Sequence, residues 1–256
     1  MKIVVCCKAV PGQVSDVKIA AGGRALDYQS QFHSMNECDE SALEEAVFLK
    51  KAHGGEVIAL TMGPITTMDI LYLATAKGAD KMVRIDAQVQ DPEAAATVLA
   101  AALKSLAPDL ILTGTQSRDT LSGSVGILAA EKLGLPFAYA VTKVEKDGDD
   151  AVKVRKELGG GRYADVRLPL PALLCVQTGI QPITFVPPAR MMRARQQAPK
   201  SFSLADLGIA DDQTKARRYT FDSVFPPVRT GKVDFLEGPA PDVAAQLLSR
   251  IREVLR

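Results

Sequence analysis

Four short apolar segments, separated by helical patterns, dominate the first 140 residues of the chain. They lie at 2–8, 57–62, 81–85 and 110–113, and their apolar residues run together without alternating with polar ones. Continuous runs of this length are typical of strands that are buried on both faces of a parallel sheet. The alternation of strand and helix therefore predicts an α/β fold with a doubly wound, mainly parallel sheet.

The helices between these strands carry their own start and stop signals. Asp91, Pro92 and Glu93 combine a capping side chain, a proline suited to the first turn and an acidic residue near the positive helix end. Glycines follow the helical patterns and predict where each helix ends. Helices are expected at 39–53, 66–77, 91–106 and up to residue 133.

The pattern changes after residue 136. Four further strand-like segments follow, and glycine turns separate several of them, which predicts antiparallel strands added to one edge of the sheet. These segments lie at 139–144, 151–157, 162–168 and 172–177. A smaller hairpin is expected within 11–26, where two glycines can turn the chain.

The C-terminal part shows little periodicity before a final amphipathic helix at 242–255. Residues 190–195 are rich in arginine and are expected to form a solvated basic loop. A stretch as long as 200–241 without regular pattern is unusual inside a compact domain, so we expect it to lie on another subunit. The sequence thus divides into an α/β domain at 1–180 and an extended C-terminal arm at 181–256.

Composition excludes several functions. The 31 Lys and Arg residues against 30 Asp and Glu residues leave a formal net charge of +1, which disfavours a dedicated nucleic-acid binder. No apolar run approaches the roughly 20 residues needed to cross a bilayer, so a cytoplasmic protein without direct membrane insertion is expected. The two histidines and four cysteines lack metal-ligand spacing, and no nucleophile motif is present. No metal site is expected, and the chain is poor in ready-made catalytic groups.

Three segments are expected to meet at the carboxyl ends of the parallel strands, where ligands bind in such sheets. They are 6–10, 61–64 and the loop 113–126, which reads T-G-T-Q-S-R-D-T-L-S-G-S-V-G. Glycines in this loop allow close backbone approach, and the helix after it directs free N–H groups toward a ligand. The loop is either a site for a nucleotide phosphate or a polar cap of the helix that follows.

The acidic residues of the first helix have a simpler interpretation. Asp39-Glu40 and Glu44-Glu45 are expected to serve as a helix cap and a solvated face, not as an acid/base pair. His53, at the end of the same helix, is expected to interact with the helix dipole.

Several segments together resemble the β subunit of electron transfer flavoproteins, and the similarity covers nearly the whole chain. The start, K-I-V-V-C-C-K-A-V, is similar to the family's first strand. Residues 34–50 are similar to its S-M-N-P-x-D-E…E-E-A-V-x-L-K block, and 74–80 to its A-L-A-x-G-A-D motif. Residues 191–195 fall where the family has I-M-K-A-K, and 227–230 where it has P-x-R-T. The order of these motifs along the chain makes the resemblance specific.

This resemblance implies a heterodimeric electron carrier. An α subunit would hold most of the FAD, and this chain would bind AMP or, in an electron-bifurcating member, a second FAD. Electrons would come from flavin-dependent dehydrogenases and pass toward a membrane quinone oxidoreductase. The domain at 1–180 would bind the nucleotide, and 181–256 would supply a partner-recognition loop and an arm packed on the α subunit. The family's nucleotide site falls on Cys6, Asn36, Asp39, Met62, Gly114, Asp119, Ser122, Gly123, Ser124 and Val125.

Two other classes of protein stay open at this point. An adenine-nucleotide-binding regulatory protein of the universal-stress type would have a similar sheet and no flavin, but its glycine pattern requires Gly where this chain has Ser117. An ATP-using ligase or hydrolase on this fold would need a Lys or Ser phosphate motif, which the chain lacks.

Overall fold

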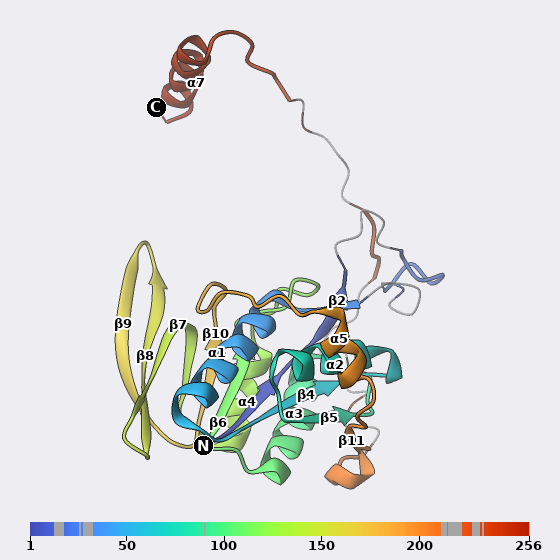
Figure 1. Ribbon diagram of the computed structural model, residues 1–256. Coiled ribbons are helices and arrows are strands. Elements are labelled where there is room, and N and C mark those ends of the chain that lie inside the picture. The colour runs from blue at the N-terminus through green and yellow to red at the C-terminus, as the bar shows by residue number, and fades with distance from the viewer. Residues whose placement is uncertain are drawn as a thin grey trace.

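The computed structural model describes residues 1–12, 18–25, 27, 33–89, 91–210, 214, 222–226, 231 and 233–255. Within this part of the chain, nine strands form one central sheet (Figure 1). In chain order they are β1 (Lys2–Cys6), β4 (Glu56–Met62), β5 (Lys81–Ile85), β6 (Leu110–Gly114), β7 (Phe137–Asp147), β8 (Ala151–Gly159), β9 (Arg162–Pro169), β10 (Ala172–Val176) and β11 (Lys200–Phe202). In space the order is β11-β5-β4-β1-β6-β10-β7-β8-β9. Because the chain runs outward from β1 in both directions, the sheet is doubly wound, as predicted.

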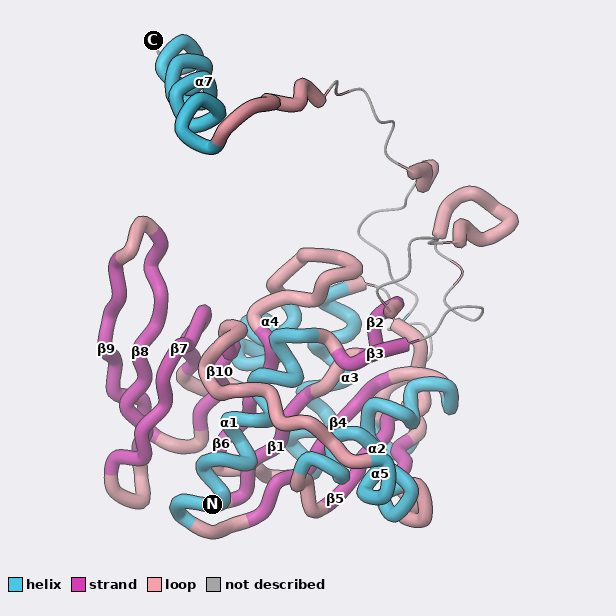
Figure 2. Tube along the Cα trace, turned by 45° about the horizontal axis from the view of Figure 1, so that its top comes forward, coloured by secondary structure: helices cyan, strands magenta, loops and turns pink. Residues whose placement is uncertain are grey.

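Helices cover both faces of this sheet (Figure 2). One face carries α1 (Glu37–His53) and α2 (Met68–Lys77), which follows the 3-10 turn η1 (Ile65–Thr67), and the other carries α3 (Pro92–Leu106) and α4 (Val125–Leu133). Side chains along β1 alternate between the faces, so Ile3 and Val5 join the core under α1 and α2, whereas Val4 joins the core under α3 and α4. Two cores explain why the strand sequences are continuously apolar.

The helix ends follow the sequence signals closely. Asp91 caps α3, because its Oδ1 accepts the backbone N–H groups of Glu93 at 2.9 Å and Ala94 at 3.0 Å. Gly134 ends α4 in a left-handed conformation, with φ of 65°, which glycine adopts without strain. The predicted starts of α1 and α2 differ from the observed starts by two residues only.

The strands after α4 are predicted correctly in place, but one is wrong in direction. β7, β8 and β9 form the expected antiparallel edge, and Figure 1 shows β8 and β9 reaching past the body of the domain. β10 does not extend this edge; it lies between β6 and β7 and pairs in parallel with both. All of β10 is buried. Its position is therefore set by burial in the middle of the sheet, which a hairpin-like sequence pattern does not reveal.

The basic stretch at 190–195 is mainly helical, which corrects the predicted loop. α5 (Pro188–Ala194) begins with a proline in its first turn and packs against α2, where Ala194 is buried. The chain then returns to the sheet, since β11 pairs in parallel with β5, and the 3-10 turn η2 (Ala205–Leu207) follows. Residues beyond 180 thus supply an edge strand of the sheet.

The final helix, α7 (Ala240–Val254), lies apart from the α/β domain (Figure 1). None of its described residues is buried, and Leu247, Leu248 and Ile251 are 49%, 51% and 45% exposed. In the described part of the chain, no helix combines the length and the apolar character that a membrane span requires.

A small antiparallel sheet lies beside the main one. It pairs β2 (Ala9–Pro11) with β3 (His33–Met35). The hairpin predicted within 11–26 falls partly outside the described residues. Its turn is described, and the N–H of Ala20 donates to the carbonyl of Ala25 at 2.9 Å.

The acidic residues of α1 are mostly buried, which corrects the predicted solvated face. Asp39, Glu44 and Glu45 are 6%, 6% and 1% exposed. Glu44 pairs with Lys77 of α2 at 2.6 Å, and Glu45 accepts a hydrogen bond from Gln181 at 2.9 Å. These partners lie 33 and 136 residues away. A pattern within the helix could not predict them.

Candidate functional site

The candidate site lies where the strand order reverses, between the neighbouring strands β1 and β6. The chain leaves β1 toward β4 on one side and leaves β6 toward α4 on the other, so the loops diverge at the carboxyl ends of the strands. A cavity opens between them. Cys6, Cys7 and Lys8 line it from the end of β1, and 113–117 line it from the end of β6.

Asp39 joins the ends of these two strands. Its Oδ2 accepts the backbone N–H of Lys8 at 2.8 Å, and its Oδ1 accepts the backbone N–H of Gly114 at 2.8 Å. A side chain at position 114 would collide with Asp39 and Cys38, so this close approach requires glycine. Burial raises the pKa of Asp39 to about 6, although the two N–H groups lower it. Asp39 thus fixes the strand ends that form one side of the cavity.

Side chains outside the loop hold the segment 114–124 in place. Asn36 Nδ2 donates to the carbonyl of Gln116 at 2.8 Å, and Asn36 Oδ1 accepts the N–H of Arg118 at 3.1 Å. Lys8 Nζ lies 2.8 Å from Asp119 Oδ1. Burial raises the pKa of Asp119, but the hydrogen bond and charge of Lys8 outweigh it and hold that pKa below its usual value. Asn36 and Asp119 therefore act mainly on the shape of the loop.

The N-terminus of α4 opens on the cavity without a side-chain cap. Ser124, at the N-cap position, makes no capping hydrogen bond, in contrast to Asp91 of α3. In the described chain, no hydrogen bond uses the N–H groups of 122–127. Helix N-termini carry unpaired N–H groups and a partial positive charge, which favour an anion. The helix start is thus available to a negatively charged ligand.

Gly126 brings this helix start close to the sheet. A Cβ at position 126 would lie 2.7 Å from both Cys175 Sγ and Thr113 Oγ1, which is closer than real contacts allow. Gly123 has φ of +61°, and a Cβ there would lie 2.9 Å from the hydroxyl of Tyr139. The two glycines therefore determine how deeply the loop lies in the cavity.

The cavity has polar and apolar lining groups. Hydroxyl and N–H groups of 113–126 and the ammonium of Lys8 are donors that suit a phosphate. A second group of lining residues suits a flat apolar ring such as a base. This group consists of Leu60, Met62, Val89, Pro92, Ala95 and Leu99. The donor set and the apolar surface together fit a nucleotide.

The structure brings the predicted site residues together. Eight of the ten line the cavity: Cys6, Asp39, Met62, Gly114, Ser122, Gly123, Ser124 and Val125. Asn36 and Asp119 do not line it and instead hold the loop. Lys8, Gln116 and Ser117, which also line the cavity, fall within the predicted segments 6–10 and 113–126 although they were not among the ten residues. The prediction missed the side of the cavity that α3 forms with Pro92, Ala95 and Leu99, because nothing in the sequence places this helix beside the loop.

The thiols beside the cavity are held in the protonated form. Burial and the nearby Asp39 raise the pKa values of Cys6 and Cys7 well above the ordinary range. Burial also raises the pKa of Cys175 to about 11. All four cysteines are free. Because the thiolate is the reactive form, Cys6, Cys7 and Cys175 act as apolar packing groups.

The fold and the cavity define a doubly wound α/β protein with a ligand site at its switch point. The family model of the electron transfer flavoprotein domain matches residues 26–207. Two relatives, from Methylophilus methylotrophus and Clostridium acetobutylicum, are named electron transfer flavoprotein subunit beta. Each is 30% identical to this chain, over 99% of this chain and 98% of its own length. One from Bacillus subtilis is 30% identical over 85% of both chains.

The chain therefore belongs to the electron transfer flavoprotein family, and the predicted resemblance to its β subunits is confirmed. Its role is in electron transfer in association with a flavin.

Proposed function

We propose that this chain is the β subunit of a heterodimeric electron transfer flavoprotein. It carries electrons from flavin-dependent dehydrogenases toward a membrane quinone oxidoreductase. The observation that carries the proposal is the similarity over 99% of the chain to proteins named as β subunits, because it includes the C-terminal arm as well as the domain. The side chains of such a subunit bind and orient, while the cofactor supplies the redox chemistry.

The cavity between β1 and β6 is proposed to hold an adenine nucleotide. This is AMP, or the adenylate part of a second FAD if the protein bifurcates electrons, while the α subunit holds most of the redox FAD. The N–H groups of Ser124, Val125 and Gly126 would donate to a phosphate at the start of α4. Lys8 would lie beside the nucleotide with its ammonium paired to Asp119, and Met62 would contact the base. Asp39 and Asn36 would keep the strand ends and the loop in position.

The arm at 181–256 is proposed to contact other proteins. The α subunit would cover the apolar side of α7, because Leu247, Leu248 and Ile251 lie half exposed on a helix without buried residues. Amphipathic helices of this kind gain most of their stability by packing an apolar face against a partner. The segment around α5 would contact a dehydrogenase.

Co-expression with the α subunit tests this proposal. We expect a yellow 1:1 complex on gel filtration that contains FAD. A matched variant that ends at residue 239 and so lacks α7 should yield much less complex, while its α/β domain keeps its circular dichroism spectrum. Two colourless proteins that elute separately would contradict the proposed heterodimer.

A further inference from the structure

A buried ion pair ties the segment before α5 to helices α1 and α2. The side chain of Lys77, the last residue of α2, is 1% exposed. Its Nζ lies 2.6 Å from Glu44 Oε1 and 3.0 Å from Glu40 Oε1, and it donates to the carbonyl of Thr184 at 2.7 Å. One ammonium therefore connects two helices to a loop that lies more than 100 residues further along the chain.

Thr184 completes this contact from the loop side. Its backbone N–H donates to Glu44 Oε1 at 2.8 Å, and its hydroxyl donates to Glu44 Oε2 at 2.8 Å. Within the described chain, the backbone hydrogen bonds of 179–186 are limited to those of Thr184 with Glu44 and Lys77. We call Lys77, Glu44 and Thr184 the charge clasp. Together with the hydrogen bond from Gln181 to Glu45, the clasp connects the loop between β10 and α5 to α1 and α2.

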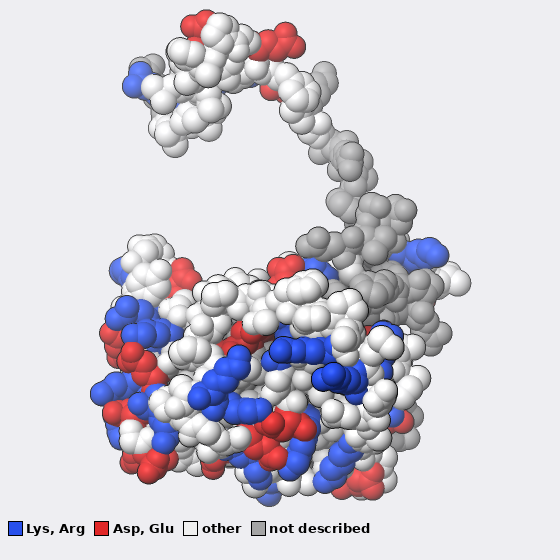
Figure 3. All heavy atoms as spheres, in the orientation of Figure 1, with Lys and Arg blue, Asp and Glu red and all other residues white. Residues whose placement is uncertain are grey.

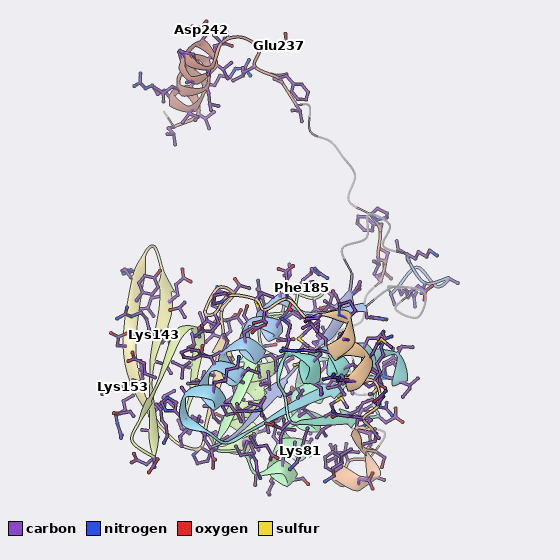
Figure 4. The ribbon with its side chains drawn as sticks, in the orientation of Figure 1. Lys81, Lys143, Lys153, Phe185, Glu237 and Asp242 are labelled. Atoms are coloured by element: carbon purple, nitrogen blue, oxygen red, sulfur yellow. The ribbon has the colours of Figure 1, made fainter. Side chains whose placement is uncertain are left out.

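Apolar packing supports the two ends of this segment more than its middle, since Ile180 packs against the core and Ala194 of α5 is buried. A cavity of about 610 Å³ lies beneath 183–195 and is bordered by residues of α1, α2 and β3. The apolar side chains on the segment point largely to solvent, since Ile183 is 53%, Phe185 80% and Met192 68% exposed. Figure 4 labels Phe185 at the rim of the domain, close to α5. Ile183 and Phe185 also border this cavity, so the segment covers it only in part.

The same surface is basic as well as apolar. Figure 3 shows Lys and Arg side chains gathered over the area of α2 and α5, and α5 and the residue after it contribute Arg190, Arg193 and Arg195. Arg195 Nη2 lies 3.1 Å from Asp69 of α2, so the far end of α5 is also tied to that helix. Exposed apolar side chains flanked by arginines fit a partner with an apolar pocket and an acidic rim.

The clasp is not explained by stability alone. A buried ion pair pays a large desolvation cost, and apolar residues of similar volume often stabilise a fold as well or better. A charged and fully hydrogen-bonded group can instead fix the position of the segment that it binds. Burial raises the pKa of Glu44, but the hydrogen bonds from Lys77 and Thr184 outweigh it and hold that pKa below its ordinary value.

We propose that Lys77 is a positioning residue, which fixes the segment 178–195 and thereby the surface that a dehydrogenase contacts. The identity of the partner rests on the proposed function, whereas the clasp rests on the contacts among Lys77, Glu44 and Thr184.

The test compares the heterodimer carrying Lys77→Met with wild type. Hydrogen exchange by mass spectrometry reports the segment itself, and steady-state kinetics report docking to a purified flavin-dependent dehydrogenase that reduces the wild-type heterodimer. We expect faster exchange within 178–195 in the variant. We also expect the KM for the heterodimer to rise about tenfold, because the free energy of one hydrogen bond to a charged group corresponds to at least a tenfold change in affinity. The kcat, the FAD content and the nucleotide content should not change.

Lys50→Met is the matched control. Lys50 also forms an ion pair, with Asp80 at 2.6 Å, but it touches no residue of the segment. If Lys77→Met fails to fold, the double variant Lys77→Met with Glu44→Gln removes the charge left behind and should still speed exchange within 178–195.

The outcomes separate the clasp from the function. Unchanged exchange within 178–195 in both variants would overturn the role of Lys77. Faster exchange with a raised KM supports both the clasp and the docking surface. Faster exchange with an unchanged KM would support the clasp and reject the dehydrogenase contact of the proposed function.

Discussion

Glu45 on α1 is a buried carboxylate whose charge opposes folding near neutral pH. Its side chain is covered, at 1% exposure, and Gln181 Nε2 donates to its Oε2 at 2.9 Å. Burial raises the pKa of Glu45 from 4.5 to about 7, and the bond from Gln181 lowers it only in part. Replacement by the isosteric, neutral glutamine removes the charge and keeps an acceptor for Gln181.

The sign and size of the effect follow from this pKa. When burial raises the pKa of a carboxyl, its full contribution to the free energy of unfolding is present below the unfolded-state pKa. That contribution is lost as the pH rises through the folded-state pKa. The loss therefore occurs between about pH 4.5 and pH 7. Because one pKa unit corresponds to about 1.4 kcal/mol, ionised Glu45 costs the folded state about 3 kcal/mol at pH 8. From pH 5 to pH 8, Glu45→Gln should gain about 2 to 3 kcal/mol relative to wild type.

Urea unfolding at pH 5, 6, 7 and 8 measures this gain, with the free energy of unfolding taken by linear extrapolation. The difference between variant and wild type isolates Glu45 from Asp39, which titrates in both proteins. Glu131→Gln is the control, because Glu131 is an exposed glutamate on α4 and its replacement changes the net charge equally. A Glu45→Gln difference that stays constant with pH would refute the reasoning.

Two further substitutions test the local structure around the cavity. Asp91→Ala removes the cap of α3 and should lower the free energy of unfolding in urea by about 1 kcal/mol. Ser124→Ala removes no cap and should lower it by less than about 0.5 kcal/mol. Equal losses would contradict the assigned capping. Gly126→Val would force the start of α4 away from Cys175, so the purified heterodimer should lose its nucleotide, as quantified by mass spectrometry after denaturation; full retention would show that this close approach is unnecessary.

The sequence predicted those features that depend on neighbouring residues. The cap at Asp91, the end of α4 at Gly134 and the glycine turns of the antiparallel edge are each encoded within a few positions. Continuous apolar runs identified the parallel strands because burial on both faces removes alternation. The loop 113–126 could also be located from neighbouring residues, because a strand followed by a glycine-rich helix start is a local pattern.

Features set by distant residues were missed. Nothing in E-E-A-V indicates that Glu44 is buried, because its partners Lys77 and Thr184 lie 33 and 140 residues away. The helical state of α5 depends on packing against α2, which its arginine-rich sequence does not show. The parallel direction of β10 likewise depends on the partners it finds, β6 and β7.

The central claim is that the cavity between β1 and β6 holds an adenine nucleotide in a flavin-containing heterodimer. Denaturing the purified heterodimer and quantifying the released small molecules by mass spectrometry tests it most directly. We expect one adenine nucleotide in addition to the one FAD held mainly by the α subunit, either AMP or a second FAD. Release of a single FAD and no other nucleotide would contradict the claim.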